Sequence, residues 1–294
     1  MSYEIEAKPF GGKSYSRADM AKMDQAVLGA LLRERVHHNI EVPLYPTLLK
    51  WKGNPISSFG LQAQLVFDVW VERGFLLDTP DIEWVSKYLS IASKIRAGEI
   101  FDWEEPLPAP FSDEEMVVVH KLIYGRHSIR DWCDKPVPAE MIEKVLEAGR
   151  AAPIGCNLDE IRFIVIQGSE EAEMIWSDIS TKHAVIIVIC YDTRIPQIVY
   201  QDRFVPQNAG FDAAAAGDHM LLMAHALGLG AVWLSKLVKT ELTEDTGAKF
   251  KKLYGLPDYI EVAMHIAIGW PAIGTIKSER IPLTDMMISR NKTM

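Results

Sequence analysis

The sequence predicts an α+β fold in which helices flank a β-sheet. Four strand-like apolar runs lie in the second half of the chain, at 161–166, 184–191, 231–237 and 260–268. Segments whose apolar residues repeat at helical spacing fill the first half and separate the strands. With 294 residues, of which 48% are apolar, the chain can build a sizeable core in one large domain, or in one domain with an extension.

The first 110 residues are predicted to form a mostly helical extension. Its helices are expected at 17–35, 59–75 and 81–97. Four tryptophans are dispersed among them, Trp51, Trp70, Trp84 and Trp103, as is typical of core anchors rather than of a binding surface. The stretch 103–110 holds three prolines and cannot be helical throughout, so it predicts a linker. We therefore expect two units, residues 1–110 and 111–294.

The second unit begins with a helix that has clear end signals. Ser112 and Glu115 have the spacing of a capping box, and Gly125 closes the helix. Pro138 is suited to the first turn of the next helix, which keeps helical spacing up to Gly149.

The strands and helices that follow complete the sheet. The run 184–191 is nearly all apolar and should be buried on both faces. A small-residue helix is expected over 210–227, ended by Gly228 or Gly230. A further helix, ended by Gly255 and Pro257, separates the last two strands.

Charge and cysteine content exclude several classes of function. A formal net charge of −9 without a long basic tract argues against a sequence-independent grip on nucleic acid. The three cysteines form neither a zinc pattern nor an even disulfide framework, which favours a reducing compartment. The longest apolar run is far too short to span a bilayer, and the N-terminus lacks a signal-type apolar core. We expect a cytoplasmic protein with no metal site and no membrane span.

A short basic cluster follows the helix that ends at Gly125. It reads Arg126-His127-Ser128-Ile129-Arg130. Two guanidinium groups and a hydroxyl are suited to phosphate, because an Arg fork matches phosphate oxygens and stays charged at working pH. A charged, solvated turn is the alternative, and for the cluster taken alone it is the better interpretation.

Four separated blocks, in order along the chain, resemble the FMN-dependent nitroreductase family. They are Arg126-His127-Ser128-Ile129-Arg130-Asp131-Trp132, Ala152-Pro153-Ile154-Gly155-Cys156-Asn157, the run from His225 to Trp233, and Ile266-Ala267-Ile268-Gly269-Trp270-Pro271 followed by Lys277 and Arg280. The resemblance implies a nitroreductase-like fold, with a central mixed, mostly antiparallel sheet flanked by helices, and a homodimer with FMN at its interface. It does not extend to the first 110 residues.

The same resemblance implies which residues hold the FMN phosphate and ribityl chain. They are Arg126, Ser128 and Arg130, with His127 stacking or hydrogen-bonding beside them, and Lys277 and Arg280 as a second basic pair. A phosphate dianion buried between subunits needs several fixed cations, so cations from two distant segments suit it. Without the resemblance, Lys277 and Arg280 would be interpreted as part of a solvated tail.

Residues of two other segments are implied around the flavin ring. Asn157 would offer its amide to the ring edge, and Pro153, Ile154 and Gly155 would supply backbone and apolar contacts from the same loop. Backbone N–H groups at Ser235 and Lys236 would lie near flavin N5. The alternative for Asn157 is a turn-forming residue. Gly228-Leu229-Gly230 is not a dinucleotide fingerprint, because it follows a helix and precedes a strand.

The sequence departs from the family pattern after Asn157. Relatives often carry Gln-Pro-Trp there, whereas this chain has Leu158-Asp159-Glu160-Ile161. If Asp159 or Glu160 faces the pocket, a cationic or protonatable substrate group is favoured. Exposure of both carboxylates is the preferred expectation.

The implied function is hydride transfer through bound FMN. NADH or NADPH would reduce flavin N5, and a nitroaromatic, quinone or enone would then be reduced; no catalytic acid or base is assigned, because the cofactor carries the chemistry. Reductive dehalogenation and consumption of the flavin to make a benzimidazole are alternatives within the family. A non-enzymatic flavin-binding protein, or a helical interaction module with an unrelated α/β core, would lie outside it.

Overall fold

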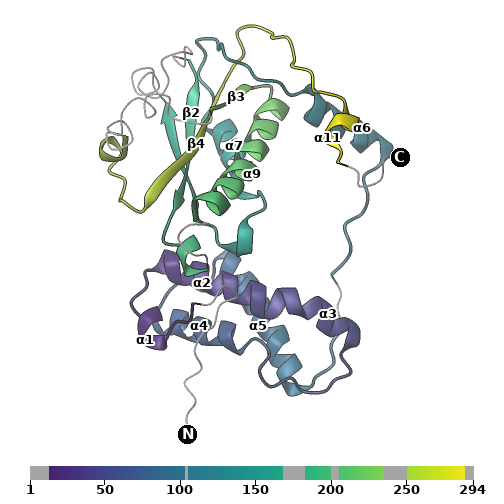
Figure 1. The fold of residues 1–294 in the computed structure, drawn as a ribbon, viewed down its shortest axis with the longest axis vertical. Helices are drawn as coiled ribbons and strands as arrows, with labels where there is room; N and C mark the ends of the chain where they lie inside the picture. Colours follow the sequence, from purple (N-terminus) through teal and green to yellow (C-terminus); the bar gives the residue numbers. More distant parts are fainter. Residues whose placement is uncertain (1–12, 103–104, 168–182, 200–204, 235–249, 289–294) are drawn as a thin grey trace.

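A computed structural model of the chain describes residues 13–102, 105–167, 183–199, 205–234 and 250–288. Figure 1 shows the N-terminal helices, in purple and blue, gathered below a sheet that has helices of its own. Within the described ranges, no helix is both long enough and apolar enough to cross a bilayer.

The N-terminal region is helical, as expected, but its helices are divided differently. They are α1 (Arg17–Met20), α2 (Gln25–Val36), the π-helix η1 (His37–Glu41), α3 (Val42–Lys50), α4 (Leu61–Glu72) and α5 (Pro80–Ala97). The prediction of one helix over 17–35 was wrong, because the Asp24 side chain accepts the Val27 N–H at 3.0 Å and caps a new helix. Helix α3 was not predicted, because Pro46 lies inside it.

The core of these helices extends into the rest of the chain. It contains Leu28, Leu31 and Trp70 among many buried side chains of α2, α4 and α5. Leu158 and Ile195, which come from loops beside the sheet, belong to the same buried cluster. The helical region and the sheet region therefore share one apolar core at their junction.

The sheet has four described strands in the order β1-β2-β4-β3, and each neighbouring pair is antiparallel. The strands are β1 (Ile161–Gln167), β2 (Val185–Asp192), β3 (Gly230–Leu234) and β4 (Ile260–Gly269). All residues of β2 are buried, as predicted for a strand covered on both faces. The described strands lie within a residue or two of the predicted runs, and residues 235–237 of the third run lie outside the described part.

The two faces of the sheet are covered by different parts of the chain. On one face, Ile186 and Val188 pack with Ile129 and Trp132. On the other face, the alternate residues of β2 pack against α7 (Ala139–Arg150) and α9 (Val205–Ala226), which lie side by side in Figure 1.

The remaining described elements are one longer helix and three short ones. They are α6 (Asp113–Gly125), the short 3₁₀ turns η2 (Gly155–Asn157) and η3 (Pro196–Ile198), and α11 (Leu283–Met286). The predicted capping box of α6 is confirmed, since Ser112 and Glu115 each bond the other's backbone N–H, at 3.3 and 2.8 Å. Pro138 is the N-cap of α7 rather than a residue of its first turn, which is a small correction to the prediction. Gly228 follows α9 with φ 77°, a left-handed conformation that favours glycine.

Candidate functional site

The basic cluster lies at the edge of β3, outside the last strand of the sheet. Ser128 forms a parallel bridge with Ala231, and the Ile129 N–H donates to the Ala231 carbonyl at 3.0 Å. The buried Trp132 indole N–H donates to the Gly230 carbonyl at 3.0 Å. These bonds attach the segment 128–132, which contains Arg130 and begins two residues after Arg126, to the edge of the sheet.

The C-terminal tail returns to the same edge. The Cys133 N–H donates to the Trp270 carbonyl at 2.8 Å, and the Thr275 hydroxyl donates to the Ser128 carbonyl at 3.1 Å. The Lys277 ammonium donates to the Tyr124 carbonyl, two residues before Arg126. The structure thus brings the predicted second basic segment to the first within one chain.

Among the described residues, four cations of the two basic segments have no acidic partner. Arg126 is half-buried, whereas Arg130, Lys277 and Arg280 are exposed. In the part of the chain that the structure describes, none of these four side chains forms an ion pair with a carboxylate. Their chemistry fits an anion such as a phosphate ester, which needs several donors with positive charge. His127 Nδ1 lies 3.2 Å from the Gly125 carbonyl oxygen and is tied to the local turn.

The predicted ring-contacting loop lies elsewhere in the chain. The Gly155 N–H donates to Asp212 Oδ1 at 3.0 Å, which ties the loop to the N-terminal half of α9. Cys156, Asn157 and Asp159 have positive φ angles of 54°, 55° and 54°. A left-handed conformation at three non-glycine residues is strained, and such strain persists only where surrounding contacts hold it.

The cluster and the loop lie near opposite ends of α9. A Cβ added to Gly125, next to Arg126, would lie 2.9 Å from His225 Nε2 near the end of α9, whereas Gly155 is bonded to Asp212. The thirteen residues from 212 to 225 correspond to about 20 Å along the helix. A single chain therefore does not bring Asn157 to the arginines.

A cavity of about 320 Å³ opens beside the loop. Its lining includes Pro153 and Ile154 of the loop, Arg150 at the end of α7, and Asp212 of α9. Pro80 and Asp81, at the start of α5, form another wall. The N-terminal helices therefore contribute directly to the pocket that the predicted ring-contacting residues line.

Arg33 of α2 holds this wall and the loop together. Its guanidinium donates to Asp81 Oδ2 at 3.0 Å and to the Leu158 carbonyl at 2.9 Å. The Nε atom lies 3.1 Å from Asp159 Oδ2 and completes an ion pair. The Arg33 side chain is 11% exposed, whereas the carboxylates of Asp81 and Asp159 keep 34% and 53% of their side-chain surface in contact with water.

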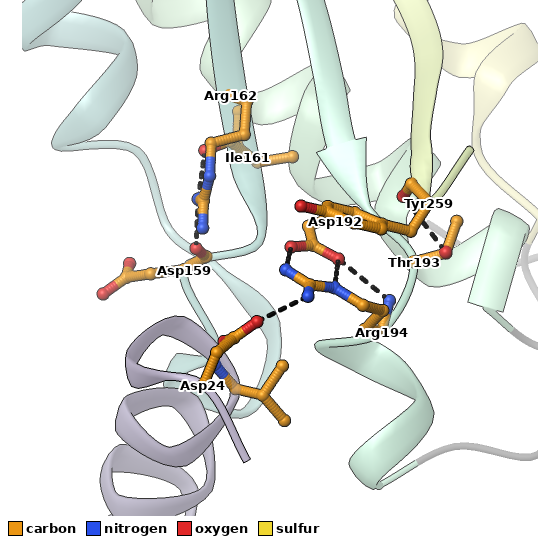
Figure 2. A network of polar contacts seen from close by, with 9 residues as sticks. Asp24, Asp159, Ile161, Arg162, Asp192, Thr193, Arg194 and Tyr259 are labelled. Carbon is orange, nitrogen blue, oxygen red and sulfur yellow. Dashed lines mark hydrogen bonds and ion pairs between the residues drawn. The ribbon is translucent and has the colours of Figure 1, made fainter. Parts of the chain in front are cut away.

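A second ion-pair network joins α2 to the sheet. Figure 2 shows Arg194 between Asp24 of the N-terminal region and Asp192 at the end of β2, with distances of 2.5 and 2.6 Å. The guanidinium carbon lies 3.5 Å from the centre of the Tyr259 ring. The same figure shows Arg162 donating to the Asp159 carbonyl at 2.8 Å.

The acidic residues after Asn157 have different environments. Asp159 is exposed, as expected, but it lines the cavity and pairs with Arg33. The expectation that Glu160 is exposed was wrong, because its side chain is fully buried. Burial, reinforced by the Asp212 carboxylate, raises the pKa of Glu160 to about 8. Burial and the acidic neighbour thus favour the neutral, protonated form of the Glu160 carboxyl group.

Two predicted residues, Ser235 and Lys236, lie outside the described residues, directly after β3. The sequence reasoning missed Arg33, Asp81 and Asp212, which are single charged residues on helices. Asp212 is one of two carboxylates within the small-residue helix, the other being Asp218, and a charge in such a helix was the available signal. No group of three or more His, Cys, Asp or Glu side chains in the described ranges is suited to a metal ion.

Comparison with known proteins identifies a family. A sequence model described as the Nitroreductase family matches residues 123–182 and 175–270. An Archaeoglobus fulgidus protein named for NADH dehydrogenase and NAD(P)H nitroreductase activity is 31% identical over 156 residues, which cover 51% of this chain and 84% of the relative. A Bacillus subtilis protein named FMN reductase [NAD(P)H] is 25% identical over 183 residues, covering 56% of this chain and 70% of the relative.

A solved structure agrees at the level of fold. The structure of NfrA1 from B. megaterium superimposes with a TM-score of 0.52 at 21% identity, and the match covers 59% of this chain and 74% of that chain. The likeness supports the α+β fold read from the sequence.

Proposed function

The chain belongs to the nitroreductase family, and on that premise we propose that it is an FMN-dependent oxidoreductase using NADH or NADPH. The observation that supports this most directly is the return of the Lys277 segment to the basic cluster that begins at Arg126. The Lys277 ammonium group, bonded to the Tyr124 carbonyl, and the Arg126 guanidinium come from remote parts of the sequence, and several cations suit the binding of one phosphate group.

The phosphate site is proposed to consist of Arg126, Ser128, Arg130 and Lys277. The unpaired guanidinium groups would bind the phosphate oxygens, while the bonds of Ser128 and Ile129 to β3 keep the segment in position. Arg280, three residues beyond Lys277 in an exposed tail, would close on the phosphate from the C-terminal side.

The ring site is proposed to come from the loop 153–157 and from the chain after β3. Pro153 and Ile154 line the cavity and offer apolar contact to the ring, and the Asn157 amide offers hydrogen bonds to its edge. Backbone N–H groups at 235–236 would follow β3 towards flavin N5. These residues bind and orient the ring, and they exclude water from it.

FMN, when bound, would supply the redox chemistry of hydride transfer between a nicotinamide and an oxidised organic acceptor. No side chain is assigned as a catalytic acid or base. A nitroaromatic, quinone or enone is proposed as the acceptor, since the cavity of about 320 Å³ beside the loop suits a small molecule.

A homodimer is proposed, because one chain does not join its own two half-sites. The cluster and the loop are separated by about 20 Å along α9. A two-fold axis would bring the loop of one protomer to the cluster of its partner. Helix α6 supports this arrangement, since it buries none of its residues and exposes Val117, Val118 and Ile123.

The division of the chain is also proposed. Residues 111–294 would bind the flavin, and residues 1–110 would form a helical extension. The family match begins at residue 123, which supports this division. Contacts of Arg33 and Asp81 with the loop and cavity support a role for the extension at the pocket. The cytoplasm is the proposed compartment, since cysteine usage favours a reducing environment.

The decisive experiment is anaerobic reduction of the purified protein loaded with FMN. NADH or NADPH should bleach the flavin absorbance, and a nitroaromatic or quinone should restore it with the flavin intact. A coloured protein that neither nucleotide bleaches would contradict an oxidoreductase and favour a flavin-binding protein. Loss of flavin during turnover would identify a flavin-consuming reaction instead, and release of halide from a haloaromatic substrate would identify a dehalogenase.

A further inference from the structure

Glu160 has an unusual position immediately before β1. Its backbone carbonyl accepts the Asp192 N–H at 3.0 Å, so its main chain continues the sheet. Its carboxyl group is fully buried, and within the described residues neither oxygen has a hydrogen-bond partner of normal geometry. A buried carboxyl group without a cation is costly unless it remains protonated.

The Glu160 carboxyl group has acidic neighbours. Asp212 of α9 faces it, and Asp159 precedes it in the loop. The nearby cations are engaged elsewhere, since Arg33 pairs with Asp159 and Asp81, and Arg162 donates to backbone carbonyls.

A further charged neighbour belongs to β2. The Asp192 carboxylate is paired with Arg194, which also reaches Asp24. Arg150, which lines the same cavity, pairs with Glu147. Among the described residues, neither oxygen of the Glu160 carboxyl group has a cationic partner.

Asp212 connects this buried acid to the loop. Its Oδ1 atom accepts the Gly155 N–H at 3.0 Å, and its side chain lines the cavity together with Ile154. The loop needs such support, because Cys156, Asn157 and Asp159 all have left-handed backbone conformations.

We propose that Glu160 is a positioning residue, whose protonated carboxyl group lies against Asp212 and keeps the loop 153–159 in the conformation that contacts the flavin. The inference rests on the proposed function, because it assumes that this loop contacts the ring. One proton between the two carboxyl groups removes their repulsion and leaves Asp212 free to accept from Gly155.

Loss of that proton has a defined consequence. Burial and the Asp212 carboxylate raise the pKa of Glu160 to about 8. Above that pH, two carboxylates face each other in a buried space, and the loop must shift to separate or hydrate them. FMN affinity should therefore be constant below the transition and fall above it.

Flavin binding over pH tests the proposal. The dissociation constant of FMN is measured by fluorescence quenching from about pH 6 to about pH 10, a range that brackets the Glu160 transition. In the wild-type protein, the FMN dissociation constant should rise about tenfold across the transition, equivalent to about 1.4 kcal/mol of binding free energy. Glu160→Gln, which stays neutral and keeps its shape, should show no such weakening. Glu143→Gln on the exposed side of α7 is the matched control and should follow wild type. If Glu160→Gln follows wild type as well, the proposal is wrong.

A second measurement needs no flavin. Hydrogen exchange of the loop peptide in the apo-protein, compared with Glu160→Gln at the same pH, should be faster in wild type above the transition and equal below it. Asp212→Asn should move the wild-type transition to lower pH, because it removes the like charge. Equal exchange in all three proteins across the whole range would overturn the proposal. A protein that shows the exchange transition but binds no FMN would contradict the proposed function and leave the coupling of Glu160 to the loop intact.

Discussion

At the scale of single residues, Arg126 shows how a half-buried cation is prepared for a ligand. It follows the last residue of α6, directly after a glycine that lies close to His225. Its neighbours Ser128 and Ile129 are bonded to β3, so the guanidinium starts from a backbone that cannot move far. A cation held in this way loses little entropy when it binds an anion.

Arg126→Ala should weaken FMN binding. A hydrogen bond to a charged group contributes about 1.5–3 kcal/mol, so the dissociation constant should rise roughly 10- to 100-fold. Titration of the apo-protein with FMN measures this. Lys144→Ala, which removes an exposed cation from α7, controls for the change in net charge. An unchanged dissociation constant in Arg126→Ala would contradict its assignment to the phosphate site.

The sequence predicted the site residues that lie close to one another along the chain. Arg126 and Arg130 are close together in sequence, so their cluster is visible without a structure. Arg33 and Asp212 are not, because their partners Leu158 and Gly155 lie 125 and 57 residues away. Burial of Glu160 could not be predicted from the sequence either, since charged residues are usually exposed and its burial depends on tertiary packing.

At the scale of elements, the packing of α7 against α9 depends on a glycine. A Cβ at Gly149 would lie 2.2 Å from Met220 Cε and 2.9 Å from Met220 Cγ. Met220 is fully buried and has little room to withdraw. The two helices therefore approach more closely than a larger residue would allow.

Gly149→Ala should destabilise the protein by about 1–3 kcal/mol, because overpacking outweighs the gain in helix propensity. Gly210→Ala in α9 is the matched control, because within the described part of the chain its added Cβ would meet no atom within 4 Å beyond its own helical turn. That variant should be stabilised by up to about 1 kcal/mol. Urea unfolding measures both changes. Equal free energies of unfolding for the two variants would show that the contact with Met220 does not limit the packing.

The sequence predicted the elements best where one signal dominated. The run that became β2 is apolar throughout, and both of its faces are covered. The ends of α6 were also clear, since Ser112 and Gly125 mark them. The region 17–50 was predicted less well, because apolar spacing continues across the break at Asp24 and Pro46 is retained inside a helix.

At the scale of the whole molecule, α6 and the tail beside it present an exposed apolar surface. Helix α6 exposes Val117 and Val118, and the tail that returns to it exposes Ile276 almost completely. Side chains of this kind on a helix with no buried residue are typical of a surface that meets another protein chain. A second copy of the chain is the proposed occupant.

Val117→Asp should shift the protein towards monomer, because it introduces a charge into the proposed interface. Analytical ultracentrifugation over a range of concentrations measures the change. Val71→Asp on α4, another exposed valine in the N-terminal region, should leave the oligomeric state as in wild type. A wild-type protein that sediments as a monomer at every concentration would contradict the dimer.

The apolar core that the helices share with Leu158 and Ile195 also bears on protein engineering. The proline-containing segment 105–110 is exposed and has no regular structure, so it is an obvious point at which to truncate the protein from its N-terminus. A fragment beginning there would lose the helices that pack on Leu158 and Ile195, and these apolar side chains would be exposed to water. Such a truncated protein should aggregate and be poorly soluble, and a stable shorter protein would have to retain α2, α4 and α5.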